Sequence, residues 1–156
     1  MISITGTHEC KVDAKGRLLL PSAFKKQLPD IQSGFVLKRS IYNPCLELWP
    51  MAEWNLMMQN LNNLNRHVRE NDKFFTRFMA GVKLIDMDDV GRILVGKDLI
   101  AFAKIQKEVV FASKINIIEI WDKELYEKEV SFDNEEFMQQ AENVMKNFNT
   151  TGNGIS

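Results

Sequence analysis

Short apolar runs and tight polar turns alternate along most of the chain, and their order occurs twice. Residues 13–20 align with residues 88–95, because both read Asp-x-x-Gly-Arg followed by three apolar positions. Farther on, residues 46–49 and 118–121 both read apolar-Glu-apolar-Trp. The two alignments are offset by 75 and 72 positions. Because two ordered blocks recur at nearly constant spacing, we predict an internal duplication.

Within each copy, the hydrophobic period and the turn residues predict four short strands and two helices. The expected strands cover residues 8–12, 17–20, 35–37 and 45–49, and then 82–87, 92–95, 109–111 and 117–121. The expected helices cover residues 22–28, 51–65, 97–103 and 123–130. The fold class is therefore α+β and rich in strands. A β-β-α-β-β-α unit of this size cannot bury its own sheet faces, so we expect the two copies to share one core.

The repeated turns have a chemical explanation in their aspartate and glycine residues. The Asp13 and Asp88 carboxylates can accept hydrogen bonds from backbone N–H groups two residues further on. Gly16 and Gly91 supply the positive φ that a tight reversal requires. We also expect that Asp13 could pair with Arg17 across the turn.

Capping residues and apolar spacing predict where other helices lie. Ser22 fits an N-cap and Pro29 a stop. Between the copies, Asn71-Asp72 fits a cap and Gly81 a stop around an aromatic stripe that we expect to pack in the core. This stripe consists of Phe74, Phe75, Phe78 and Met79. A C-terminal amphipathic helix and a disordered tail from Asn149 to Ser156 should follow.

Composition limits the class of protein. The chain has 156 residues, of which 45% are hydrophobic and 26% charged. These are the proportions of a globular protein. The chain lacks a run of 18 apolar residues and a secretory N-terminus, so we expect no membrane contact. Its two cysteines are too few for a disulfide scaffold, which makes a reducing cytoplasm the simplest location.

Charge is distributed unevenly along the chain. Lys and Arg outnumber Asp and Glu by four in residues 1–39 and by three in residues 66–83, whereas residues 119–142 carry a balance of -7. The acidic stretch can be a solvated face or a binding surface, and the sequence favours neither interpretation. Lys11, Lys15 and Arg17 cluster at the first repeated turn, where they could contact phosphate groups.

The residues offer little for catalysis or for metal binding. His8 and His67 are the only histidines, and no nucleophile motif accompanies them. The spacing of these histidines and the two cysteines, Cys10 and Cys45, matches no zinc pattern, and the cysteines fit buried apolar positions better. Asp86, Asp88 and Asp89 lack the further oxygen ligands of a magnesium or calcium loop, and the Gly-x-Gly at 152–154 follows no strand. We therefore expect no enzyme, no metal, no cofactor and no small-molecule substrate.

The four motif blocks, at residues 6–21, 45–50, 88–94 and 118–122, resemble the bacterial MraZ family over about residues 1–130. The resemblance implies two tandem AbrB-like (SpoVT-AbrB) units, each a swapped-hairpin β-barrel with short flanking helices, related by a pseudo-two-fold axis. The implied repeats cover residues 5–52 and 81–124. Connecting helices would cover residues 53–80, and the C-terminal helix and tail residues 125–156.

The same resemblance implies a function. Members of the family are cytoplasmic, nucleoid-associated transcriptional regulators of the division and cell-wall gene cluster that contains their own gene. They form closed homo-oligomeric rings and bind short direct repeats in double-stranded promoter DNA. By motif position, Lys15 and Arg17 would be DNA contacts, with Arg92 as the second-copy counterpart and Lys11 beside them.

This chain departs from the family pattern in its second turn. Val90 stands where the first copy has Lys15, and Gly96 stands where it has Pro21. We therefore expect the first turn to bind DNA, and the second to be a packing or subunit-contact turn. Two other functions stay open: a ring scaffold that binds no DNA, and an antitoxin-like AbrB relative that holds a partner with its C-terminal helix. For the ring contact, an acidic surface and an apolar helix are equally good candidates.

Overall fold

The computed structural model describes residues 2–155, with side chains described as far as Phe148. It divides into two units, Met1–Leu125 and Tyr126–Ser156, each considered by itself. The expected α+β class is confirmed, because antiparallel strands form the framework of the first unit and helices flank it. Among the described residues, no helix is long and apolar enough to span a membrane.

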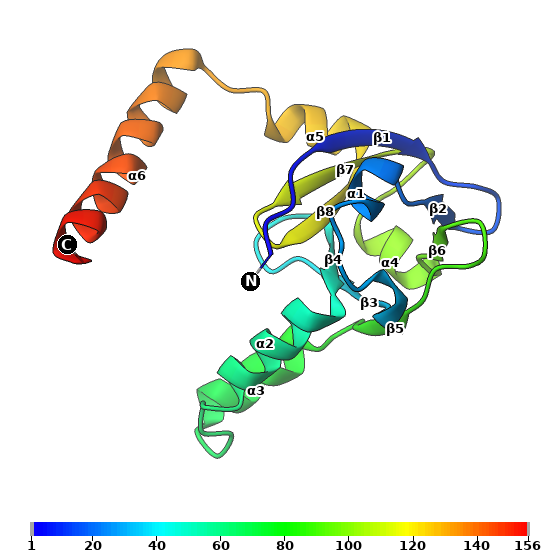
Figure 1. The fold of residues 1–156 in the computed structure, drawn as a ribbon, viewed down its shortest axis with the longest axis horizontal. Helices are drawn as coiled ribbons and strands as arrows, with labels where there is room; N and C mark the ends of the chain where they lie inside the picture. The colour runs from blue at the N-terminus through cyan, green and yellow to red at the C-terminus, as the bar shows by residue number, and fades with distance from the viewer. Residues whose placement is uncertain (1, 156) are drawn as a thin grey trace. The chain divides into compact units, whose positions relative to one another are not determined.

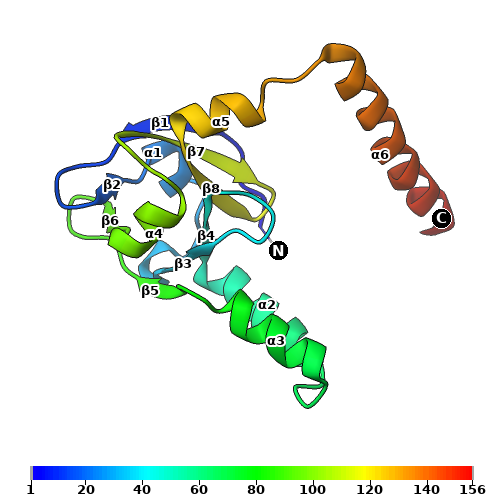
Figure 2. The ribbon, with the colours of Figure 1, turned by 180° about the vertical axis from the view of Figure 1, so that it is seen from behind.

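The first copy has the expected order of strands and helices, with boundaries that shift by a few residues. Its elements are β1 (Thr7–Lys11), β2 (Arg17–Leu19), α1 (Ser22–Lys25), the 3-10 turn η1 (Ile31–Ser33), β3 (Phe35–Arg39), β4 (Leu46–Pro50) and α2 (Met51–Leu61). The connecting helix α3 (Arg69–Phe78) follows. Helices α2 and α3 run side by side as a hairpin in both views (Figures 1 and 2).

The second copy repeats this order without the 3-10 turn. Its elements are β5 (Lys83–Ile85), β6 (Arg92–Leu94), α4 (Lys97–Phe102), β7 (Glu108–Lys114), β8 (Ile117–Asp122) and α5 (Lys123–Glu129). The long helix α6 (Asn134–Ile155) lies in the C-terminal unit. Helix α6 continues to Ile155, whereas a disordered tail was predicted from Asn149 onward.

Most strand pairs join the two copies rather than strands of one copy. The main sheet has the order β1-β7-β8-β4-β3-β5, and β2 pairs with β6 in a separate two-stranded sheet. The first-copy strand β1 pairs with β7, and its second-copy equivalent β5 pairs with β3. The copies also meet symmetrically where β4 pairs with β8 and β2 with β6. Neither copy therefore has a complete sheet of its own.

One apolar core serves both copies, as predicted. Leu18 on β2 lies opposite Ile93 on β6, and both side chains are fully buried. Phe24 from α1 and Leu99 from α4 belong to the same cluster. Removing this apolar surface from water is the main driving force for joining the repeats. A second, smaller cluster around Trp54 attaches the α2–α3 hairpin to the sheet.

The repeated apolar-Glu-apolar-Trp block has the same geometry in both copies. Trp49 donates its indole N–H to Glu47 on the same strand at 3.1 Å, and Trp121 donates to Glu119 at 3.1 Å. Both indoles are buried. A buried N–H group needs an acceptor. Residues two apart on a strand share one face, so the glutamate in each block can accept the indole N–H of the tryptophan two positions later.

Three predictions about the helices were wrong in detail. Ser22 is not the N-cap of α1, because Pro21 holds that position without a side-chain cap bond. Helix α3 begins at Arg69, before the expected Asn71-Asp72 cap. Of the aromatic stripe, Phe78 is buried and stacks on Trp54, with ring centroids 5.8 Å apart, whereas Phe74 is 38% exposed. Only part of the stripe therefore packs in the core.

Candidate nucleic-acid interface

The first repeated turn is organised by the Asp13 carboxylate. Its Oδ1 accepts hydrogen bonds from the backbone N–H groups of Lys15 and Arg17, each at 2.9 Å. Its Oδ2 accepts a bond from Nε of Arg17 at 2.8 Å, so the expected Asp–Arg pair is confirmed. The backbone N–H of Arg17 is the main cause that holds the pKa of Asp13 below its ordinary value.

The second turn copies this arrangement almost atom for atom. Oδ1 of Asp88 accepts the backbone N–H groups of Val90 at 3.0 Å and Arg92 at 2.9 Å. Oδ2 of Asp88 accepts Nε of Arg92 at 2.8 Å. The backbone N–H of Arg92 is the first cause that lowers the pKa of Asp88 to about 2. Both carboxylates are therefore ionised at neutral pH.

The two turns lie beside each other at one end of the first unit (Figures 1 and 2). Gly16 and Gly91 have positive φ values of 80° and 95°. L side chains rarely adopt this conformation. The carbonyl of Gly91 accepts a hydrogen bond from the backbone N–H of Leu20, and that of Gly16 accepts one from Val95, both at 3.0 Å. Each turn is thus braced by a strand end of the other copy.

The arginines are held more firmly than the lysines. The side chains of Arg17 and Arg92 are 27% and 32% exposed, and each is fixed through Nε. A guanidinium has further donors on its two terminal nitrogens, so an arginine held in this way can still bind a ligand. Lys11 and Lys15 are exposed, and both belong to the first copy. Three of the four candidate cations therefore belong to the first copy, within residues 11–17.

The turns have nearly the same geometry but opposite charge. With the offset of 75 positions, Lys11 corresponds to Asp86. The same offset aligns Ala14 with Asp89, and Lys15 with Val90. Residues 11–17 hold three cations and one acid, a balance of +2, whereas residues 86–92 hold one cation and three acids, a balance of -2. By these residues, an anionic ligand would be attracted more strongly to the first turn than to the second.

One cation near the second turn lies outside the repeated Asp-x-x-Gly-Arg motif. A Cβ atom added to Gly91 would collide with the Lys25 ammonium group, which places this lysine from α1 of the first copy at the second turn. At Gly16, the equivalent neighbour is Cδ1 of Ile100, on α4. Lys25 and the three acids of the second turn line a common cavity of about 610 Å³. Sequence reasoning missed Lys25, although it lies 75 positions before Ile100, because it reaches this turn only through packing between the copies.

The remaining candidate residues have structural surroundings. His8 packs edge-on against Phe24, with ring centroids 5.0 Å apart. Cys45 is buried as expected, and its burial raises the pKa of the thiol, while Cys10 is half-buried. Within the described part of the chain, no three His, Cys, Asp or Glu side chains gather as metal ligands would.

The fold and this site define an internally duplicated α+β protein that presents two equivalent turns at one end. The family model described as "MraZ protein, putative antitoxin-like" matches residues 3–75 and 78–148. The chain belongs to the MraZ family. The two matched regions correspond to the two copies and their following helices.

Several bacterial relatives match over nearly their whole length. A protein of Flavobacterium psychrophilum named "Transcriptional regulator MraZ" is 54% identical, with 100% of each chain covered. One of the same name from Christiangramia forsetii is 54% identical over 94% of this chain and 96% of its own. Another from Pediococcus pentosaceus is 38% identical over 90% and 95% of the two chains.

Proposed function

We propose that this protein is a sequence-specific DNA-binding transcriptional regulator whose first turn contacts the DNA. The role of regulator comes from the names of its relatives, which describe no enzymatic role. The choice of turn rests on one observation: two turns of nearly the same geometry carry balances of +2 and -2. DNA is a dense array of negative charge, so the cationic turn is the one suited to it.

The contacts divide into two kinds. Lys11 and Lys15 are exposed, and their long flexible side chains are suited to bind phosphate oxygens. Arg17 is oriented by Asp13 and keeps its terminal nitrogens for a base edge, where guanine O6 and N7 are the usual partners. In the second copy, Arg92 is the weaker counterpart because acids surround it.

A ring would give this small interface enough affinity. One turn offers roughly two or three phosphate contacts, which bind weakly at cellular salt. Identical turns around a closed ring would bind successive direct repeats in the promoter, and each further contact would be intramolecular. Such multivalency adds about 10²- to 10⁴-fold in affinity. Repeats spaced by about 10 bp would lie on one face of the duplex.

The remaining features of the proposal follow from the resemblance of the motifs. The target is the promoter of the division and cell-wall gene cluster, including the protein's own gene, and the protein is cytoplasmic and associated with the nucleoid. Each repeat is a swapped-hairpin β-barrel of the AbrB type. The pairing of β1 with β7 and of β5 with β3 supports this architecture, because each copy completes its sheet with strands of the other.

Matched substitutions of the two turn arginines test the proposal. Arg17→Ala should weaken binding to the DNA upstream of that cluster by at least about tenfold, the scale of one lost base contact. Arg92→Ala removes the same side chain from the acidic turn and should change binding much less. Fluorescence anisotropy at several stated salt concentrations measures both, and light scattering checks that each variant keeps its oligomeric mass.

The result also separates the competing functions. Equal losses in the two variants would contradict the assignment to the first turn. A ring scaffold would give no salt-dependent, sequence-preferring binding even in the native chain. An antitoxin-like relative would instead be isolated as a stable complex with a small protein encoded beside it.

A further inference from the structure

We infer that the groove between helices α2 and α3 receives helix α6 of a second copy of this chain. This contact would build the ring of the proposed function, and it is argued from two surfaces that the structure describes separately. One is the groove, in the first unit, and the other is the apolar face of α6, in the C-terminal unit.

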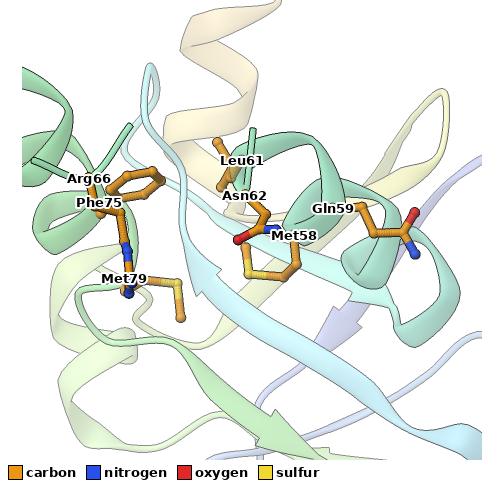
Figure 3. A pocket seen from close by; sticks show the side chains of 7 residues that line it. All are labelled: Met58, Gln59, Leu61, Asn62, Arg66, Phe75 and Met79. Carbon is orange, nitrogen blue, oxygen red and sulfur yellow. The ribbon is translucent and has the colours of Figure 1, made fainter. Parts of the chain in front are cut away.

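The groove is apolar and open. It has a volume of about 500 Å³ and is formed by α2, the following loop and the end of α3 (Figure 3). Met58 and Leu61 come from α2, Phe75 from α3, and Met79 directly follows α3. Methionine and leucine side chains adapt to an inserted partner, and calmodulin-like grooves use methionine in this way.

The α2–α3 hairpin also exposes several apolar side chains that do not line the groove. Leu56 on α2 is 44% exposed, and Leu64 and Val68 in the connecting loop are 42% and 46% exposed. Met79, which lines the groove, is 44% exposed, and Phe74, which lines a separate cavity, is 38% exposed. Exposed apolar side chains beside an apolar groove commonly mark an interaction site.

Helix α6 has a matching apolar face. Its largest apolar side chains are all about half exposed or more. They recur at the spacing of one helix face. They are Phe137, Met138, Val144, Met145 and Phe148. Most of the stability of a helix in a protein comes from packing of its amphipathic face, so the exposed apolar face of α6 calls for a partner surface. Helix-in-groove recognition provides such a surface.

Length and charge favour this pairing. At about 1.5 Å per residue, the apolar face of α6 extends about 17 Å along the helix axis. The 11-residue helix α2 has nearly the same length. The loop and helix at residues 62–80 carry four cations and two acids, whereas residues 134–148 carry three acids and one cation. These opposite balances of charge are complementary. Arg66 lies at the groove itself, where it can meet an acid of the arriving helix.

The geometry of such a contact is head to tail. The groove and the helix are different surfaces, so each copy would give its helix to one neighbour and receive a helix from another. A head-to-tail contact of this kind closes into a ring if the rotation per copy allows it. The sequence left two candidates for the ring contact, an acidic surface and an apolar helix. Helix α6 would supply both, because it carries an excess of acids and has an exposed apolar face.

Cysteine cross-linking tests the contact between copies without DNA. Two full-length variants, Met79→Cys and Met145→Cys, are co-expressed with different tags and mildly oxidised. The expected product is a disulfide-linked pair that contains one chain of each kind, identified by mass spectrometry of the joined peptides. The native chain, with Cys45 buried and Cys10 half-buried, gives the background. Gln139→Cys, on the side of α6 away from the apolar face, is the matched control.

Two outcomes would overturn the proposal. One is a yield of mixed pairs no higher than with the Gln139→Cys control. The other is a double variant, Met79→Cys with Met145→Cys, that forms only a disulfide within one chain. A charge introduced into the contact gives an independent measurement. Met145→Asp should lower the oligomeric mass measured by light scattering, and Gln139→Asp should leave it unchanged.

The test distinguishes this contact from the DNA-binding proposal. If cross-links form but the native chain binds no promoter DNA, the proposed function fails and the contact stands. If DNA binding depends on Arg17 but no mixed cross-link forms, the function stands and α6 has another partner.

Discussion

At the scale of single residues, each turn arginine is positioned by one carboxylate that also closes the turn. Asp13 and Asp88 make the same three hydrogen bonds, two to backbone N–H groups and one to an arginine Nε. The carboxylate therefore fixes the backbone and the guanidinium together. Arginine positioned in advance loses less conformational entropy on binding than a free side chain does.

Replacement of this carboxylate should separate the positioning of Arg17 from simple charge. Asp13→Ala raises the net charge by one, so a purely electrostatic interface would bind DNA more tightly. We expect binding to promoter DNA to weaken by about tenfold instead, because Arg17 loses its fixed orientation towards a base. Binding isotherms on promoter and unrelated DNA measure the change.

Asp88→Ala is the matched control, since it breaks the same three bonds in the acidic turn. The two variants should have similarly lowered Tm values, and only Asp13→Ala should lose preference for the promoter. Tighter promoter binding by Asp13→Ala would show that Asp13 acts only through its charge.

At the scale of elements, sequence patterns predicted the strands and helices because their signals are local. The Asp-x-x-Gly-Arg turns and the period of the apolar positions indicate β2 and β6 within a few residues. Pairings between copies, such as that of β1 with β7, depend on long-range packing that no local pattern contains. The position of Lys25 beside Gly91 and the exposure of Phe74 on α3 were missed for the same reason.

The join between the sheet and the α2–α3 hairpin contains a buried ion pair. The Lys38 side chain on β3 is only 1% exposed, and its Nζ lies 3.7 Å from Glu47 on β4 and 4.3 Å from the ring centroid of Phe78 on α3. Burial is the first cause that lowers the pKa of Lys38, while Glu47 opposes this shift. Glu47 also accepts the indole N–H of Trp49. Lys38 thus connects the sheet to the hairpin, and Glu47 pairs with its charge.

Glu47→Gln should be strongly destabilising although it keeps an acceptor for Trp49. Removal of one partner of a buried pair leaves an uncompensated charge, which costs about 3 kcal/mol or more. The double variant Lys38→Met with Glu47→Gln removes both charges, and methionine can pack against Phe78. The double variant should therefore recover most of the lost stability, as measured by urea unfolding. If the double variant is no more stable than Glu47→Gln, the loss does not arise from the unpaired lysine.

At the scale of the whole molecule, duplication has produced two turns that share a framework and differ in charge. The strand pairing of β2 with β6 and the bonds of the glycine carbonyls hold both turns at one end of the first unit. Only three aligned positions produce the difference between +2 and -2, namely Lys11 against Asp86, Ala14 against Asp89, and Lys15 against Val90. One framework therefore carries a balance of +2 in the first turn and -2 in the second.

This division of roles predicts that DNA contact can be transferred to the second turn. A variant with Asp86→Lys, Asp89→Ala and Val90→Lys gives residues 86–92 the charges of residues 11–17. Because the backbone framework already matches, the new lysines should reach phosphate groups and tighten promoter binding. The slope of log affinity against log salt should become steeper by about 0.9 for each added phosphate contact. Anisotropy titrations over a series of salt concentrations measure this slope.

The transfer requires a control for net charge, since the three substitutions raise the net charge of the chain by four. Neutralising four exposed acids gives the same gain elsewhere, with Gln at Glu124, Glu127 and Glu129 and Asn at Asp133. If the second turn faces the DNA, the triple variant should steepen the slope more than this control does. Equal slopes in the two variants would mean that the second turn lies away from the duplex, and that the cations of the first turn alone set the salt dependence.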